Sequence, residues 1–247
     1  AKGILSWLCD KVAPFSHLFG IPGLGVFAML KLTFVSFAAP MASLSIMDAK
    51  RFNKRHIAAT LAMVFTMSQG NATFPMLALG LNLPVLLISS LIGGLLSAAF
   101  TYYIMTRNLP YDEISAKEDE IAPSEEKQNK SVMQILSDGG MDGMKIAMNM
   151  IPMLILALFL VKVLEVVHAI ELLTTLLGPV LALIHLPEAA VLPLVTKYIA
   201  GGTAYMGIMF DLVKQGAISV REMNMMAGFA TNPFDVAGVA LFAAIGK

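Results

Sequence analysis

Residues 57–81 read IAATLAMVFTMSQGNATFPMLALGL, an apolar stretch with one polar interruption around Gln69 and Asn71. A bilayer core about 30 Å thick requires roughly 20 mainly apolar residues in a helix. Five other windows have the same character: residues 23–47, 84–105, 146–167, 189–210 and 223–245. The runs are continuous and do not alternate, which indicates helices and not strands. We therefore predict an all-α fold, a polytopic (multi-pass) membrane helical bundle with broken helices.

The composition excludes a water-soluble globule. Hydrophobic residues make up 57% of the 247 residues and charged residues only 14%, with a mean hydropathy of +0.75. A soluble domain carries about 25% charged residues to cover its surface. The net charge of +0 leaves no basic surplus for phosphates, so no nucleic acid is expected as a partner. The expected surroundings are a lipid bilayer.

A basic loop predicts the orientation of the chain. Lys50, Arg51, Lys54, Arg55 and His56 lie close together between two spans, and the positive-inside rule places such a loop in the cytoplasm. Counting spans from this loop puts the mixed-charge segment 108–130 in the cytoplasm too. We therefore divide the chain into a first membrane half at 1–107 (repeat 1 plus an extra span), an acidic cytoplasmic linker at 108–130, and a second membrane half at 131–247 (repeat 2).

Two pairs of prolines indicate that the halves are repeats. Pro179 and Pro187 follow Pro14 and Pro22 by the same 165 residues (179 − 14 and 187 − 22), and inexact repeats of this kind are frequent in transporters. On this alignment a helix is missing at each end of the chain. The charged turns 48–56 and 211–222 should lie on the same cytoplasmic side, so that an axis along the membrane normal relates the halves.

Each half also contains small-residue and polar interruptions. We expect the helices to break at residues 38–40 and 201–203, because proline removes a hydrogen-bond donor and glycine weakens a helical turn. The polar tripeptides 69–71 and 231–233 interrupt a later span in each half. With a short insertion in the first half, Asn71 and Asn232 become equivalent, and both should face one cavity near mid-membrane.

The polar tripeptides mark a candidate binding site. Backbone groups freed at a break within the membrane need protein or a water-filled cavity around them, and nearby amides and hydroxyls both donate and accept hydrogen bonds. This chemistry suits a small polar solute. The candidate substrate-binding residues are Gln69, Asn71, Thr73, Thr231, Asn232 and Asp235. The alternative that these side chains only join helices to each other stays open.

Charges inside apolar spans are costly and therefore informative. Asp235 could pair with Lys31 or Lys197, couple to a proton or cation, or reach an interface. The secondary candidates are the two lysines and the residues beside the small-residue breaks: Lys31, Ser36, Ser43, Lys197, Thr203 and Tyr205.

No motif indicates catalysis. The four histidines do not have metal-ligand spacing, and Cys9 is the single cysteine, which removes thiolate metal sites. The chain has no GxSxG nucleophile elbow and no Walker-type phosphate loop. We expect neither an enzyme nor a cofactor nor a metal site.

The second half carries a family resemblance. Ser137-Asp138-Gly139, Leu177-Gly178-Pro179, Leu186-Pro187 and especially the segment TNPFDVAG at 231–238 resemble the bacterial nucleoside-recognition (Gate) domain family of inner-membrane proteins, which is related to spore-maturation membrane proteins. The first half is similar at Gly70-Asn71-Ala72. The resemblance implies a transport-type module in the bacterial inner (cytoplasmic) membrane. The first half lacks the proline after Asn71, and the glutamate-bearing hairpins of concentrative nucleoside transporters are absent.

Two functions compete on these grounds. The first is a transporter, or a transporter subunit, that binds a small polar metabolite (a nucleoside, an amino acid or a peptide-like solute) between the two repeats and alternates access by rocking. The second is a non-transporting membrane scaffold or regulatory partner. The expected partners are the bilayer, the solute and a coupling proton or cation, and we expect a homo- or hetero-oligomer.

Overall fold

The computed structural model describes residues 11–110 and 166–243, apart from residue 13, together with isolated positions between 133 and 164. Every regular element in this part of the chain is helical, which confirms the all-α prediction. The first half contains η1 (His17–Phe19), α2 (Gly23–Phe34), α3 (Pro40–Ala49), α4 (Lys54–Thr66), α5 (Gly70–Thr73), η2 (Pro75–Leu79), α6 (Leu83–Phe100) and the π-helical turn η3 (Thr101–Met105). The second half contains α8 (Ala169–Leu183), η6 (Glu188–Ala190), α9 (Val191–Ala200), α10 (Gly202–Lys214), α11 (Val220–Ala230) and α12 (Val236–Phe242).

Four of the six predicted spans are broken helices. The pairs α2/α3, α4/α5, α9/α10 and α11/α12 each divide one apolar window, whereas the window 146–167 lies mostly outside the described residues. Helix α3 begins at Pro40, where a missing N–H is tolerated. Helix α9 ends at Ala200, and Gly201 takes a left-handed φ of 88° before α10 begins. The predicted breaks at 38–40 and 201–203 are confirmed.

One described helix is long and apolar enough to cross a bilayer. Residues Leu83–Met105 have a mean hydropathy of 2.1, and only 22% of the apolar window is buried. Val85, Ile88 and Leu96 are each 61% exposed, so this helix presents an uncovered apolar face. A second candidate consists of Glu171–Leu183 and Glu188–Ala200, which meet at a bend of 117°. The larger number of crossings stays a prediction.

The order of helices repeats between the halves. Helices α9, α10, α11 and α12 begin 168, 162, 166 and 166 residues after α2, α3, α4 and α5 (191 − 23, 202 − 40, 220 − 54 and 236 − 70). These shifts lie close to the proline offset. However, the second-half break spans residues 231–235 and the first-half break only 67–69, so the longer connection is in the second half. Asn71 lies inside α5 and Asn232 lies before α12, which makes the predicted equivalence of these two residues wrong.

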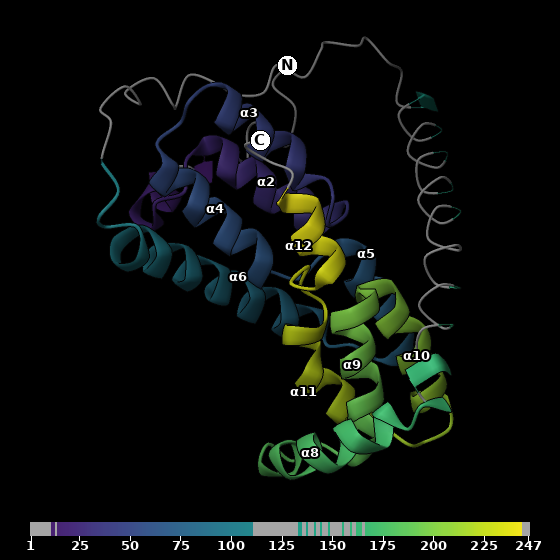
Figure 1. Ribbon diagram of the computed structural model, residues 1–247. Helices are drawn as coiled ribbons and strands as arrows, with labels where there is room; N and C mark the ends of the chain where they lie inside the picture. Colours follow the sequence, from purple (N-terminus) through teal and green to yellow (C-terminus); the bar gives the residue numbers. More distant parts are fainter. Residues whose placement is uncertain are drawn as a thin grey trace.

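The two halves have separate cores, and each contributes to the other. The first-half core contains buried residues of α2 and α3, such as Leu24 and Leu44, together with Phe242 of α12. The second-half core is built from α9, α10 and α11 and contains Ala72 and Met76 of the first half. Figure 1 shows α12 lying beside α2 and α4, and the helix also contacts α9 of its own half. The chain therefore exchanges the segment after each polar break.

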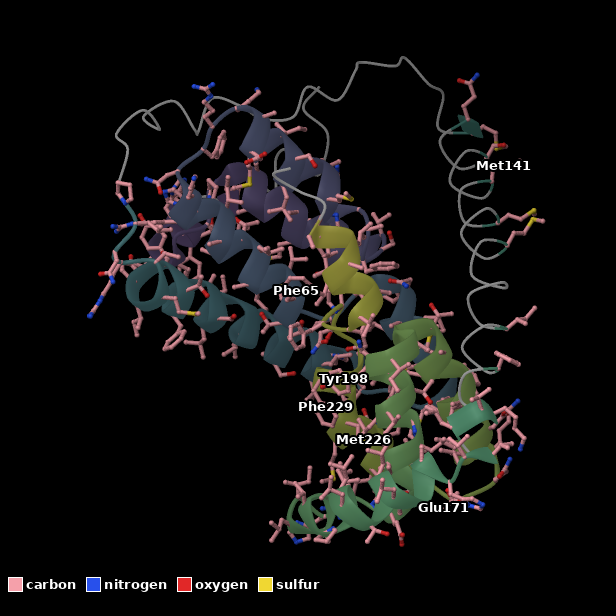
Figure 2. The ribbon with its side chains drawn as sticks, in the orientation of Figure 1. Phe65, Met141, Glu171, Tyr198, Met226 and Phe229 are labelled. Carbon is pink, nitrogen blue, oxygen red and sulfur yellow. The ribbon has the colours of Figure 1, made fainter. Side chains whose placement is uncertain are left out.

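Aromatic contacts hold α12 in the first half. The ring of Phe65 on α4 lies 5.3 Å from Phe242 and 5.7 Å from Phe234, both edge-on, a favourable geometry for aromatic pairs. Figure 2 shows Phe65 next to α12 at this junction.

Figure 1 also shows the α3–α4 turn and the α10–α11 turn at opposite ends of the molecule. This arrangement does not support the expectation that both charged turns lie on one side. Opposite ends are characteristic of halves related by an axis in the membrane plane.

Candidate functional site

The polar breaks of the two halves are in direct contact. The backbone N–H of Gln69 donates to the carbonyl of Thr231 at 2.9 Å, and the Gln69 side-chain Nε2 donates to the carbonyl of Asn232 at 3.2 Å. These bonds satisfy backbone groups that the interrupted helices leave open, as a break in an apolar environment requires. Residues more than 160 positions apart are thereby joined at one point.

Hydroxyl groups extend this contact to α6. Thr231 Oγ1 donates to Ser68 Oγ at 2.9 Å, and the backbone N–H of Ser68 donates to Ser90 Oγ at 2.7 Å. All three residues are buried. Ser90 is not among the residues predicted from the sequence, although it belongs to a serine pair in the middle of an otherwise apolar span.

A buried ion pair lies beside the second break. Lys197 Nζ is 2.6 Å from Asp235 Oδ2, and the two side chains are 0% and 5% exposed. The other oxygen, Asp235 Oδ1, accepts the backbone N–H of Gly238 at 2.8 Å and caps α12. Among the alternatives left open for Asp235, the structure contains the pair with Lys197. The Nζ atom of Lys31 instead lies 4.2 Å from the ring centroid of Phe27.

Two glycines bring the α9/α10 break against both groups. A Cβ on Gly201 would lie 3.7 Å from Asp235 Oδ2, and a Cβ on Gly202 would lie 2.8 Å from Gln69 Nε2. The latter distance is too short for a side-chain carbon, so any larger residue at position 202 would displace the Gln69 amide. The ion pair and the Gln69 side chain therefore both lie against the backbone at Gly201 and Gly202, between α9 and α10.

Some polar atoms of residues 69–73 and of α10 have no protein partner. Gln69 Oε1, Thr73 Oγ1, Tyr205 Oη and Asn71 Oδ1 are buried and accept or donate no hydrogen bond. Leaving such a group unpaired costs about 1–3 kcal/mol. Buried polar groups are normally satisfied, so unpaired ones suggest a bound molecule or ion that completes them.

The structure divides the six primary candidates into two groups. The side chains of Thr231 and Asp235 already have hydrogen-bond partners within the protein. Asn232 Oδ1 accepts the backbone N–H of Phe234 at 3.0 Å. The polar side chains of the second half therefore stabilise the non-helical segment 231–235. In contrast, the three first-half residues Gln69, Asn71 and Thr73 each keep an unpartnered oxygen.

The secondary candidates are spread more widely. Tyr205 is fully buried on α10 and belongs to the crossing, and Thr203 is half-buried in the first turn of the same helix. Ser36 lies in the α2/α3 break, where its N–H donates to the carbonyl of Lys31. Ser43 is buried on α3, away from the crossing, with an unpartnered hydroxyl.

A separate cavity of about 410 Å³ opens between α6 and α11. Its polar lining includes Asn82 and Asn224, which are joined by a 2.7 Å bond from the Asn82 N–H to Asn224 Oδ1. Because both amide oxygens already accept a backbone N–H, this cavity offers a ligand fewer free partners than the crossing does.

Among the residues that the structure describes, no three His, Cys, Asp or Glu side chains gather as a metal site. Comparison with protein-family models, with curated proteins and with solved structures finds no match.

Proposed function

We propose that this chain is a membrane transporter, or one subunit of a transporter, that binds a small polar metabolite where the broken helices of its two halves cross. The observation that carries the proposal is the junction of Gln69 with Thr231 and Asn232, surrounded by buried oxygens without partners. Discontinuous helices that meet at the interface of two repeats form the substrate sites of many secondary transporters.

The surface of the molecule supports a membrane setting. The exposed side chains of α6 form an apolar face on a helix long enough to cross a bilayer. The resemblance of residues 231–238 to the Gate domain family agrees with a bacterial inner-membrane module. We further propose an inverted arrangement of the halves, because the two charged turns lie at opposite ends.

The exchange of segments suggests how access would alternate. Helix α12 packs in the first-half core and α5 packs against α10, so neither half can move without moving a part of the other. A rocking motion would shift both polar breaks together and open the crossing to one side at a time.

Binding is tested by thermal unfolding of the purified full chain against nucleosides, amino acids, dipeptides and organic acids, because a ligand of the folded state raises its apparent stability. We expect at least one class to stabilise the protein and to be taken up by proteoliposomes. Thr73→Val should weaken that binding about tenfold, the loss of about 1.4 kcal/mol expected for one good hydrogen bond.

Thr60→Val is the matched control. Thr60 is also fully buried with an unpartnered hydroxyl, but it faces Gly25 of α2, away from the crossing. The control should leave binding unchanged. Equal effects of the two variants, or no stabilising solute combined with no uptake, would reject the proposal.

The alternative is a scaffold that docks a partner and does not transport. The exposed apolar face of α6, with Val85, Ile88 and Leu96, favours it if another membrane protein covers that face. In that case mutation of the α6 face would disrupt a complex, whereas Thr73→Val would have no effect on function.

A further inference from the structure

We infer that the crossing binds a small cation, an alkali ion or a protonated amine, held by Gln69 Oε1, Thr73 Oγ1 and Tyr205 Oη between α5 and α10. This inference deepens the proposed function by naming the charge of a ligand, and it rests on the same site. The residues are 2%, 1% and 0% exposed, and the three atoms have no protein partner.

The three residues belong to α5, with its N-cap Gln69, and to α10, and these two helices are in contact. Gln69 and Thr73 lie one turn apart on the same face of α5, since the Thr73 N–H donates to the Gln69 carbonyl at 3.0 Å. Between them on that face, Ala72 lies against Gly202 of α10. Tyr205 is one turn further along α10, and its side chain belongs to the same core as Ala72. Asn71, by contrast, lies on the opposite side of α5.

The orientation of the glutamine amide is set by its partner. Nε2 lies 3.2 Å from the carbonyl oxygen of Asn232, and only the amide nitrogen can donate to a carbonyl. Oε1 is therefore the free atom, and it can only accept a hydrogen bond or contact a cation. An anion at this point would meet an oxygen lone pair.

The positive groups near these oxygens already face a negative charge, the carboxylate of Asp235. Lys197 is paired with Asp235 at 2.6 Å. The first turn of α10, the positive end of that helix, also faces the Asp235 carboxylate, which lies 3.7 Å from the Cβ position of Gly201. With these charges paired, Gln69 Oε1 is an acceptor that a cation can contact. Neutral oxygen ligands are the set that hard cations prefer.

The size of the site limits the ligand. A Cβ on Gly202 would already lie 2.8 Å from Gln69 Nε2 and 3.3 Å from the Ala72 Cβ, so the close packing of α5 against α10 excludes a bulky quaternary ammonium group. Sodium and methylammonium present the same charge to the same oxygens, so the experiment must separate them.

The test is thermal unfolding of the purified full chain at constant ionic strength in the chlorides of sodium, potassium, methylammonium or choline, without any solute. We expect the Tm to rise with sodium or with methylammonium relative to choline, in a saturable manner. A rise with sodium alone assigns an alkali-ion site, and a rise with methylammonium alone assigns the amine of a substrate.

Two isosteric variants remove ligands without leaving a cavity. Thr73→Val and Tyr205→Phe should abolish the cation-dependent rise, and their Tm in choline should equal or exceed that of the wild type because each removes an unpaired hydroxyl. Thr60→Val should keep the full cation response. Loss of the response in the control, or its retention in both site variants, overturns the inference.

An absence of cation dependence combined with stabilisation by acetate or phosphate would also overturn it. The proposed function fails in a different way. Cation-dependent stabilisation without uptake of any solute leaves the cation site in place and removes transport, whereas uptake that needs neither cation leaves transport and removes the cation site.

Discussion

Breaking the buried ion pair should reveal how much the two halves depend on each other. Asp235→Asn leaves Lys197 charged, with 0% of its side chain exposed, and an uncompensated buried charge costs about 3–5 kcal/mol. Asparagine still caps a helix, so the Gly238 contact survives. Asp235→Ala loses the cap as well and should cost about 1 kcal/mol more.

The double variant Lys197→Met/Asp235→Asn separates charge from packing. Replacing both partners of a buried pair by uncharged groups is often neutral, so its stability should lie within about 1 kcal/mol of the wild type. The measurement is the free energy of unfolding in mixed detergent micelles, followed by far-UV circular dichroism. A cost below about 1 kcal/mol for Asp235→Asn, or a double variant as unstable as the sum of the single variants, would refute the reasoning.

Three more changes test other contacts. Gly202→Ala forces Gln69 Nε2 away from its 2.8 Å position and should cost about 1–3 kcal/mol, read from the same unfolding assay. Phe242→Ala empties a site in the first-half core and should cost about 3–5 kcal/mol. Hydrogen bonds from the Ser219 side chain and backbone hold the pKa of Glu222 below its ordinary value, so this capping box stabilises α11 above the unfolded pKa. The protection of the amides at the start of α11 against hydrogen exchange, relative to their intrinsic rates at each pH, should fall as pH falls through the folded pKa.

Each of these three tests has its own control variant. Gly228→Ala meets no atom within 4 Å and should stabilise α11 by about 0.5–1 kcal/mol. Val236→Ala, on a residue 65% exposed, should be nearly neutral beside Phe242→Ala. Ser219→Ala should remove the pH dependence of this protection. A neutral Gly202→Ala, a neutral Phe242→Ala or a pH response that persists without Ser219 would each contradict the corresponding contact.

Local chemistry made several features predictable from the sequence. The continuous apolar runs implied helices, because a helix satisfies its own backbone groups. Proline at position 40 and glycine at 201 predicted where helices break, since a missing N–H and a left-handed φ act on the residue itself. The proline offset of 165 residues likewise anticipated the repeated order of helices.

Long-range packing decided the rest. Pairing of Lys197 with Asp235 depends on how α9 and α12 approach, and the sequence offered Lys31 as an equal choice. Asn71 and Asn232 looked equivalent by their spacing to nearby prolines, yet the lengths of the breaks place one in a helix and the other outside it. The sequence identified which side chains are polar in an apolar region. Only the tertiary structure determined which of them are occupied, because a hydrogen bond depends on distance and direction between atoms that lie far apart in the chain.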